Sequence, residues 1–440
     1  MEVKFGKIRI ANFKTLSISE LILLLYISSV ILLSMIPIGN VASKIIGLVL
    51  LYSFFVAIFK TNKKVYFSQE VYIILGWLLF CLISGFAARD INLVYGKIFT
   101  ILQLLIFFIV GYSLILKGNI SVNSIFYIFI ISVAIAFLYG LLTQVNSSVI
   151  VTRNRIIGTA GDPNQIAVFG AFSILFAGYL FIIDKRVITK IFLIGLIMIL
   201  VLGIIKTQSR QGLLLIAIST ITYMVVNNFY QFRNSDNKKR IIFRFILIFF
   251  ISVIIISIIL FFFKQSDYYY RIQALLTFIK ISFGSSSDNI TKIIDYSAYE
   301  RSKLIQFGIR MWLDNPLIGV GLDNYRIVIK EYWPISNRLY SHNNYIELLS
   351  TIGTIGMIIY YGIYFSIIKK IITGINNLNF GNKNIKLLQV FMTAMISLMV
   401  LEMVTVTYYT KFTWILFMII LGYTDKLSSI NQIDKKIEKA

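Results

Sequence analysis

Long apolar runs separated by short polar segments constrain the fold of this chain more than any other feature of its sequence. An apolar helix of about 17 to 25 residues can cross a bilayer, because the hydrocarbon core is about 30 Å thick. Twelve runs fit or approach this length, at 19–37, 41–59, 70–86, 98–116, 122–142, 164–183, 190–206, 211–230, 245–263, 344–368, 387–406 and 412–424. The sequence therefore predicts an all-α integral membrane protein with about 12 transmembrane helices.

The composition agrees with a protein that is solvated by lipid. Charged residues make up 14% of the chain and hydrophobic residues 58%, whereas an ordinary soluble domain is roughly 25% charged. The formal net charge of +23 would suggest nucleic-acid binding in a soluble protein. Here the basic residues stand between apolar runs, so they are interpreted as topology signals and anion-binding groups. No nucleic-acid partner is predicted.

Lysine and arginine are concentrated in alternate loops, which predicts the orientation of the helices. These basic loops and tails lie at 4–14, 60–64, 117, 185–190, 233–244, 369–386 and 426–439. Short loops of this kind face the cytoplasm. Twelve spans then place both the N- and the C-terminus in the cytoplasm, in a multi-pass protein of the inner (plasma) membrane.

One segment on the opposite, outward side is much longer than a connection requires. It divides the chain into transmembrane helices 1–9 at residues 1–263, an outer loop at 264–343, and transmembrane helices 10–12 with a cytoplasmic tail at 344–440. Loops longer than about 12 to 15 residues are usually functional. Residues 267–283 of this loop are interpreted as a helix at the membrane interface.

Residues 299–313 of the same loop are predicted to form an amphipathic helix. Its apolar face follows helical spacing and consists of Leu304, Phe307, Gly308 and Met311. Its polar face consists of Lys303, Gln306 and Arg310. Arg301 is the exception, because it falls on the apolar side. Asn315-Pro316 is predicted to end the helix.

The chain has one histidine, His342, which precedes an apolar helix that begins near Asn344. Asn344 and Glu347 have the spacing of a capping box, so His342 is expected at the outward rim of a helix. Several arginines lie on this same side, which should be poor in basic residues: Arg153, Arg155, Arg210, Arg301 and Arg310. Arginine suits bidentate binding of phosphate. Together with a neutral histidine, these residues fit a diphosphate substrate and a proton acceptor.

Plainer interpretations stand beside these. The histidine can be a polar surface residue, and the arginines can bind lipid phosphates or anchor span ends. Glu402, near the outward end of the eleventh span, is a carboxylate within the membrane and indicates function. One histidine, one cysteine and no D-x-D motif argue against a metal site. No Walker A or G-x-S-x-G motif is present, and the sequence predicts neither a metal nor a cofactor.

Three stretches carry a resemblance to a known family. The longest runs from Arg301 to Gly356 and contains WLDNPLIGVG (312–321), SHNNYIELL (341–349) and the pair Gly353 and Gly356. The other two are RIIGTAGDPN (155–164) and TQSRQG (207–212). At these positions the sequence resembles the O-antigen polymerase/ligase superfamily. It departs from the family pattern where Gln211 stands between Arg210 and Gly212.

This resemblance implies a GT-C-like glycosyltransferase of the bacterial inner membrane, with its active site facing the periplasm or exterior. The implied donor is an undecaprenyl-diphosphate-linked glycan, used without metal or nucleotide sugar. His342 would be the general base, while Arg210 and Arg301 would bind the donor diphosphate. Further candidate substrate-binding residues are Arg155, Asn164, Arg310, Arg338, Asn343 and Glu347.

The functional hypothesis is a polymerase that joins lipid-linked repeat units of a surface polysaccharide, O-antigen or capsule. A ligase that moves the finished glycan to lipid A–core or another acceptor is an open alternative. A lipid-linked oligosaccharide flippase is a third, but it would place ionisable residues along a midplane path. A receptor with a binding loop is a fourth. The expected partners are a glycan or lipid-linked acceptor, membrane lipids, a chain-length regulator and a flippase.

Overall fold

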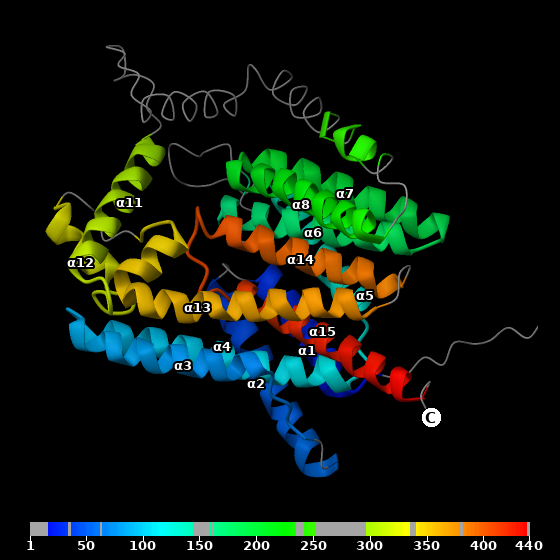
Figure 1. Cartoon of the computed structure of the whole chain (residues 1–440), viewed down its shortest axis with the longest axis horizontal. Helices are drawn as coiled ribbons and strands as arrows, with labels where there is room; N and C mark the ends of the chain where they lie inside the picture. Colours follow the sequence, from blue (N-terminus) through cyan, green and yellow to red (C-terminus); the bar gives the residue numbers. More distant parts are fainter. Residues whose placement is uncertain are drawn as a thin grey trace, which may run out of the picture.

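The computed structural model of the chain describes residues 16–33, 37–61, 64–143, 156, 159, 162–234, 239, 242–247, 249–250, 296–334, 340–378 and 382–437. The elements of these residues are all helical, which confirms the predicted all-α class. Figure 1 shows α1 (Ile18–Leu32), α2 (Pro37–Thr61), α3 (Gln69–Ser84), η1 (Gly85–Ala87), α4 (Ile91–Lys117), α5 (Val122–Thr143), α6 (Pro163–Ile183), α7 (Val187–Thr207), α8 (Arg210–Asn234), α11 (Tyr296–Asp314), α12 (Tyr325–Tyr332), α13 (Asn344–Asn377), α14 (Lys383–Leu401) and α15 (Lys411–Ile437).

Nine helices within these ranges are long and apolar enough to cross a membrane, and they coincide with nine of the twelve predicted runs. Of the other three runs, 19–37 forms the shorter helix α1 and 412–424 lies within α15. Residues 412–424 are all buried, against neighbours that include α4 and α13. A helix segment that is buried on all sides is apolar on all sides, so this run does not need the length of a membrane span. Most of the remaining run, 245–263, lies outside the described residues.

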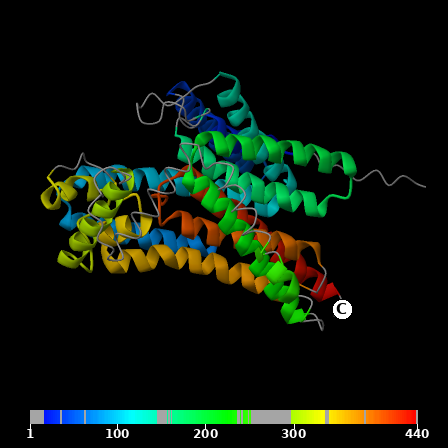
Figure 2. The same cartoon turned by 90° about the horizontal axis from the view of Figure 1, so that it is seen from above.

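The described parts of the segments predicted to face outward meet at one end of the bundle, named here the His342 end. The turn after α3 contacts the segment before α12, since Asp90 N donates a hydrogen bond to Asn324 Oδ1 at 2.9 Å. Arg89 forms an ion pair with Glu331 of α12. Both views place α11 and α12 beside the start of α13 at this end (Figures 1 and 2).

Helix α13 is broken near the His342 end at Gly353, whose φ of 67° is left-handed. The loop 316–321 fills the break, because Thr354 N donates to Pro316 O at 2.9 Å and Gly321 N donates to Thr351 O at 2.8 Å. A Cβ atom on Gly353 would clash with the carbonyl of Leu317. The loop thus satisfies backbone groups that cannot remain free in a membrane, and it fixes the first turns of α13 against the end of α11.

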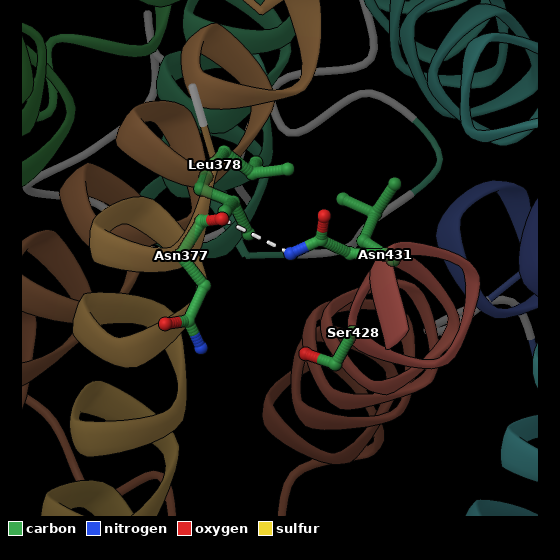
Figure 3. A pocket seen from close by; sticks show the side chains of 7 residues that line it. Asn377, Leu378, Ser428 and Asn431 are labelled. Carbon is green, nitrogen blue, oxygen red and sulfur yellow. Dashed lines mark hydrogen bonds between the residues drawn. The ribbon is translucent and has the colours of Figure 1, made fainter. Parts of the chain in front are cut away.

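The opposite end is held by a partly buried ionic network. Lys370 Nζ of α13 lies 3.0 Å from Glu70 Oε2 of α3 and 3.0 Å from Asp425 Oδ2 of α15. A small pocket between α13, α14 and α15 lies at this end, where Asn431 Nδ2 donates to Asn377 O at 3.0 Å (Figure 3). The pocket is therefore separated from His342 by the length of α13.

Candidate active site

Helix α11 presents the predicted apolar face to the bundle. Leu304, Gly308 and Met311 are buried, while Gln306 and Arg310 are exposed. Gly308 allows the close approach of α13, because a Cβ atom there would clash with the side chain of Ile346. The helix ends at Asp314, directly before Asn315-Pro316 as predicted. Arg301 is partly exposed and lies near His342, whose charge it influences.

His342 lies in a tight turn immediately before α13. Its φ of 53° is in the left-handed region, and its side chain is partly buried. Burial lowers the pKa of His342 below the ordinary 6.5, and the positive charge of Arg301 lowers it further, while Asp162 acts in the opposite direction. His342 is consequently a neutral imidazole at neutral pH, the form that can accept a proton.

The predicted capping box at Asn344 is wrong by one residue. The N-cap of α13 is Asn343, whose Oδ1 accepts from Ile346 N at 3.1 Å. Asn344 makes tertiary contacts instead: its N donates to Glu402 O at 2.7 Å, and its Oδ1 accepts from Thr407 N at 2.9 Å. Because Asn344 makes these long-range bonds, its side chain does not cap the helix as the spacing predicted.

The last residues of the first upstream motif lie beside the second motif, at the start of α6 and α8. Asp162 caps α6, and Asn164 Oδ1 accepts from Ser209 Oγ at 3.0 Å. Gly212 packs against Ala167, and a Cβ atom at Gly212 would lie 2.7 Å from Ala167 Cβ. This packing fixes Arg210, the first residue of α8, at the His342 end; its side chain is partly exposed.

A turn after α14 connects this pair of motifs to the histidine. Gln211 Nε2 of α8 donates to Val404 O at 3.1 Å. Asn343 Nδ2 donates to the preceding carbonyl, Met403 O, at 3.0 Å. Met403 and Val404, neighbours in the turn after α14, thus bind two segments of the site. Val404 binds α8, which begins with Arg210, and Met403 binds the turn that carries His342. Gln211, the departure from the family pattern, has a defined contact here.

The structure describes seven of the nine predicted site residues. Arg155 and Arg338 lie outside the described residues, as does the predicted interfacial helix at 267–283. Arg310 is exposed, with its guanidinium 5.5 Å from the centre of the Phe307 ring. Glu347 is fully buried. The functions of Arg310 and Glu347 stay predictions.

Sequence reasoning missed a charged and aromatic cluster beside the site. Lys97 Nζ of α4 lies 3.2 Å from Asp323 Oδ1 and 3.7 Å from the centre of the Tyr409 ring. Arg326 reaches Asp323 Oδ2 at 3.2 Å and lies 5.8 Å from the centre of the Tyr340 ring. A lysine at the outward end of a predicted span was the available signal, because the charge rule disfavours lysine there. The cluster fastens the outer segment to α4.

Glu402 is buried among hydroxyl groups rather than open to the site. Its carboxylate accepts from Tyr361 OH at 2.9 Å, from Tyr360 OH at 3.3 Å, and also from Tyr364 and Thr407. These bonds attach α13 to the loop that follows α14. Among the described residues, no group of three or more histidine, cysteine, aspartate or glutamate side chains could hold a metal ion.

Comparison with known proteins identifies one part of the chain. Residues 195–361 match the family described as O-antigen ligase. This stretch includes Arg210, Arg301 and His342, and it contains α8, α11 and α12 with the start of α13. No curated protein matches the chain.

Proposed function

From the membership of residues 195–361 in the O-antigen polymerase/ligase superfamily, we propose that this membrane protein is a polysaccharide polymerase. It joins undecaprenyl-diphosphate-linked repeat units on the outer face of the bacterial inner membrane. Its termini lie in the cytoplasm, and its acceptor is a second lipid-linked glycan. A flippase supplies the donor, and a chain-length regulator acts beside the enzyme.

The observation that carries this proposal is the environment of His342. The imidazole is partly buried, its pKa is lowered, and Arg301 lies near it. A neutral imidazole can take the proton of the acceptor hydroxyl as that oxygen attacks the anomeric carbon of the donor. The bond from that carbon to the diphosphate breaks, and the diphosphate leaves with the electron pair. Positive charge that is already in place stabilises this leaving group.

The arginines supply that charge in the proposed mechanism. Arg301 lies near His342 on α11, and Arg210 begins α8, which is bonded to the same turn as the His342 segment. Both side chains are partly exposed and so accessible to a ligand. Guanidinium groups bind phosphate oxygens in pairs, so the two residues suit a diphosphate that lies alongside the acceptor hydroxyl.

A complementation assay tests the proposal. His342→Ala and Arg301→Ala are expressed in a strain that lacks this gene, their membrane levels are confirmed, and the surface glycan is resolved by size. Loss of a general base typically lowers a rate about 100- to 10,000-fold, so single repeat units on the terminal acceptor are expected. Lys303→Ala, on the polar face of the same helix, is the matched control and leaves the ladder unchanged. Normal ladders from both site variants would refute the enzymatic proposal.

The ligase is the second candidate, because the matched family is described as O-antigen ligase. It uses the same donor and the same base but a different acceptor. Its loss leaves full-length polymer on the undecaprenyl carrier rather than single repeat units on the acceptor. The size and the carrier of the accumulated glycan in the same strain therefore distinguish the two.

A further inference from the structure

The backbone at His342 is held in a conformation that a histidine adopts only with support. Its φ of 53° is in the left-handed region, which is sparsely populated by residues other than glycine and is stable only where surrounding structure determines it. No hydrogen bond within the described residues involves the imidazole itself. The support must therefore come from the residues on either side.

Ser341 and Asn343 provide this support from both sides of the histidine. Ser341 Oγ donates to Asn343 O at 2.7 Å and accepts from Asn343 N at 3.2 Å, which closes the turn around His342. Asn343 is fixed in turn by its bonds to Ile346 N and Met403 O. Ser341 N donates to Glu347 Oε2 at 2.9 Å. Glu347 is thus the acceptor that holds the first residue of the turn to α13.

The position of Glu347 excludes direct contact with a ligand in this conformation. Its side chain is fully buried, and Oε2 is occupied by Ser341 N. Oε1 has no hydrogen-bond partner among the described residues. The charged groups that act on it are Asp323 and Lys97, and both are themselves largely buried. The carboxylate is therefore enclosed by protein and directed at the turn that carries His342.

We infer that Glu347 is a positioning residue for His342, which orients the imidazole by accepting the Ser341 N–H, and that it does not bind the substrate. This inference rests on the proposed function, because it gives the turn a purpose in catalysis. It reassigns Glu347 from the group of predicted substrate-binding residues. A small displacement of a reacting group can cost about 100-fold in rate, so a buried acceptor behind the base can be as important as a contacting residue.

Three substitutions separate positioning from binding. Glu347→Gln keeps an oxygen that can accept from Ser341 N, and its amide nitrogen replaces Oε1, which has no hydrogen bond to lose. Glu347→Ala removes the acceptor. Glu347→Asp keeps the carboxyl group but shortens the side chain, and it serves if the alanine variant does not fold. Ser350→Ala is the matched control, since Ser350 is buried in the same half of α13 and donates within that helix.

The first measurement is the rate at which undecaprenyl diphosphate is released from the lipid-linked oligosaccharide extracted from the deletion strain. We expect kcat to fall about 100-fold in Glu347→Ala and Glu347→Asp, with KM for the donor within twofold. Glu347→Gln and Ser350→Ala retain activity within about threefold. A glutamine variant that is folded but as inactive as alanine, or a raised KM, would show that Glu347 binds substrate or carries charge in the reaction.

The second measurement does not depend on activity. Because the chain has a single histidine, carbethoxylation by diethyl pyrocarbonate reports on His342 alone when the protein is purified without a histidine tag. Glu347→Ala is expected to change the rate or the pH midpoint of this modification, and Glu347→Gln to preserve both. An unchanged profile in every Glu347 variant overturns the inference.

The two readouts distinguish failure of this inference from failure of the proposed function. If His342→Ala is active in the release assay, the proposed function fails, whatever Glu347 does. If His342→Ala is inactive while Glu347→Ala and Glu347→Asp match the wild type, only the positioning role fails.

Discussion

At the scale of single residues, the environment of His342 makes a prediction about pH. Burial and Arg301 lower its pKa, and Asp162 opposes them. A base with a lowered pKa stays neutral to a more acidic pH, so glycosyl transfer should persist below pH 6.5 and decline only as the pH falls through the lowered pKa. Replacing Arg301 by glutamine removes one cause of the lowering and should move the carbethoxylation midpoint to higher pH.

The matched variant for this prediction is Asp162→Asn, which should move the midpoint of His342 in the opposite direction, because it removes the charge that favours the imidazolium form. Both midpoints are measured on the same purified protein, in which His342 is the only histidine. A wild-type midpoint at or above 6.5, or no shift in the arginine variant, would contradict the electrostatic description of the site.

Residue patterns predicted the candidate site only in part. Spacing identified the buried face of α11 and the end of that helix, since both follow from local rules. Motif spacing failed at Asn344, because Glu402 and Thr407, which bind it, lie about 60 residues further along the chain. The contact of Gln211 with Val404 was equally out of reach. Local sequence contains no information on which distant carbonyl a side chain meets.

At the scale of elements, the break in α13 explains two glycine-containing motifs by packing. Gly353 has φ 67° and no room for a Cβ atom beside Leu317, and Gly319, with φ 69°, approaches the backbone of Thr351 equally closely. The pattern around 312–321 and Gly353 of α13 therefore belong to one backbone contact between a loop and a broken helix. This contact fixes the first turns of α13, the helix that begins directly after the turn of His342.

Gly353→Ala is accordingly predicted to destabilise the protein. The backbone at φ 67° and ψ −174° lies in a region used almost only by glycine, which alone costs another residue about 1–3 kcal/mol, and the clash with Leu317 adds to this. The thermal unfolding midpoint in detergent should fall. Gly362→Ala in the same helix is the control, because a Cβ atom there meets only Ile73 at 3.9 Å, and it should leave the midpoint unchanged or higher. Equal midpoints for the two variants would argue against the rigid break.

At the scale of the whole molecule, the length of the apolar runs predicted most of the helices. The run at 412–424 is apolar because it is buried inside the bundle. Nine predicted runs are candidate spans in the described ranges. The last run, 412–424, is shorter than a span requires. Its residues are all buried by neighbouring helices, which accounts for their apolar composition. Run length alone cannot distinguish burial by protein from contact with lipid, since both favour the same residues.

The charge distribution also predicts which end of the molecule faces outward, and the proposed reaction depends on it. Lys330 of α12 lies at the His342 end, and Lys383 begins α14 at the other; both are exposed. Each is replaced by cysteine in a Cys81→Ala background, because the buried Cys81 lies among apolar side chains, where serine would bury a hydroxyl. A membrane-impermeant maleimide that reaches the outer face of the inner membrane in intact cells or spheroplasts should label Lys330→Cys at once, and Lys383→Cys only after lysis. The reverse pattern would place His342 in the cytoplasm, where a donor delivered to the outer face could not reach it, and the polymerase and ligase proposals would fall together.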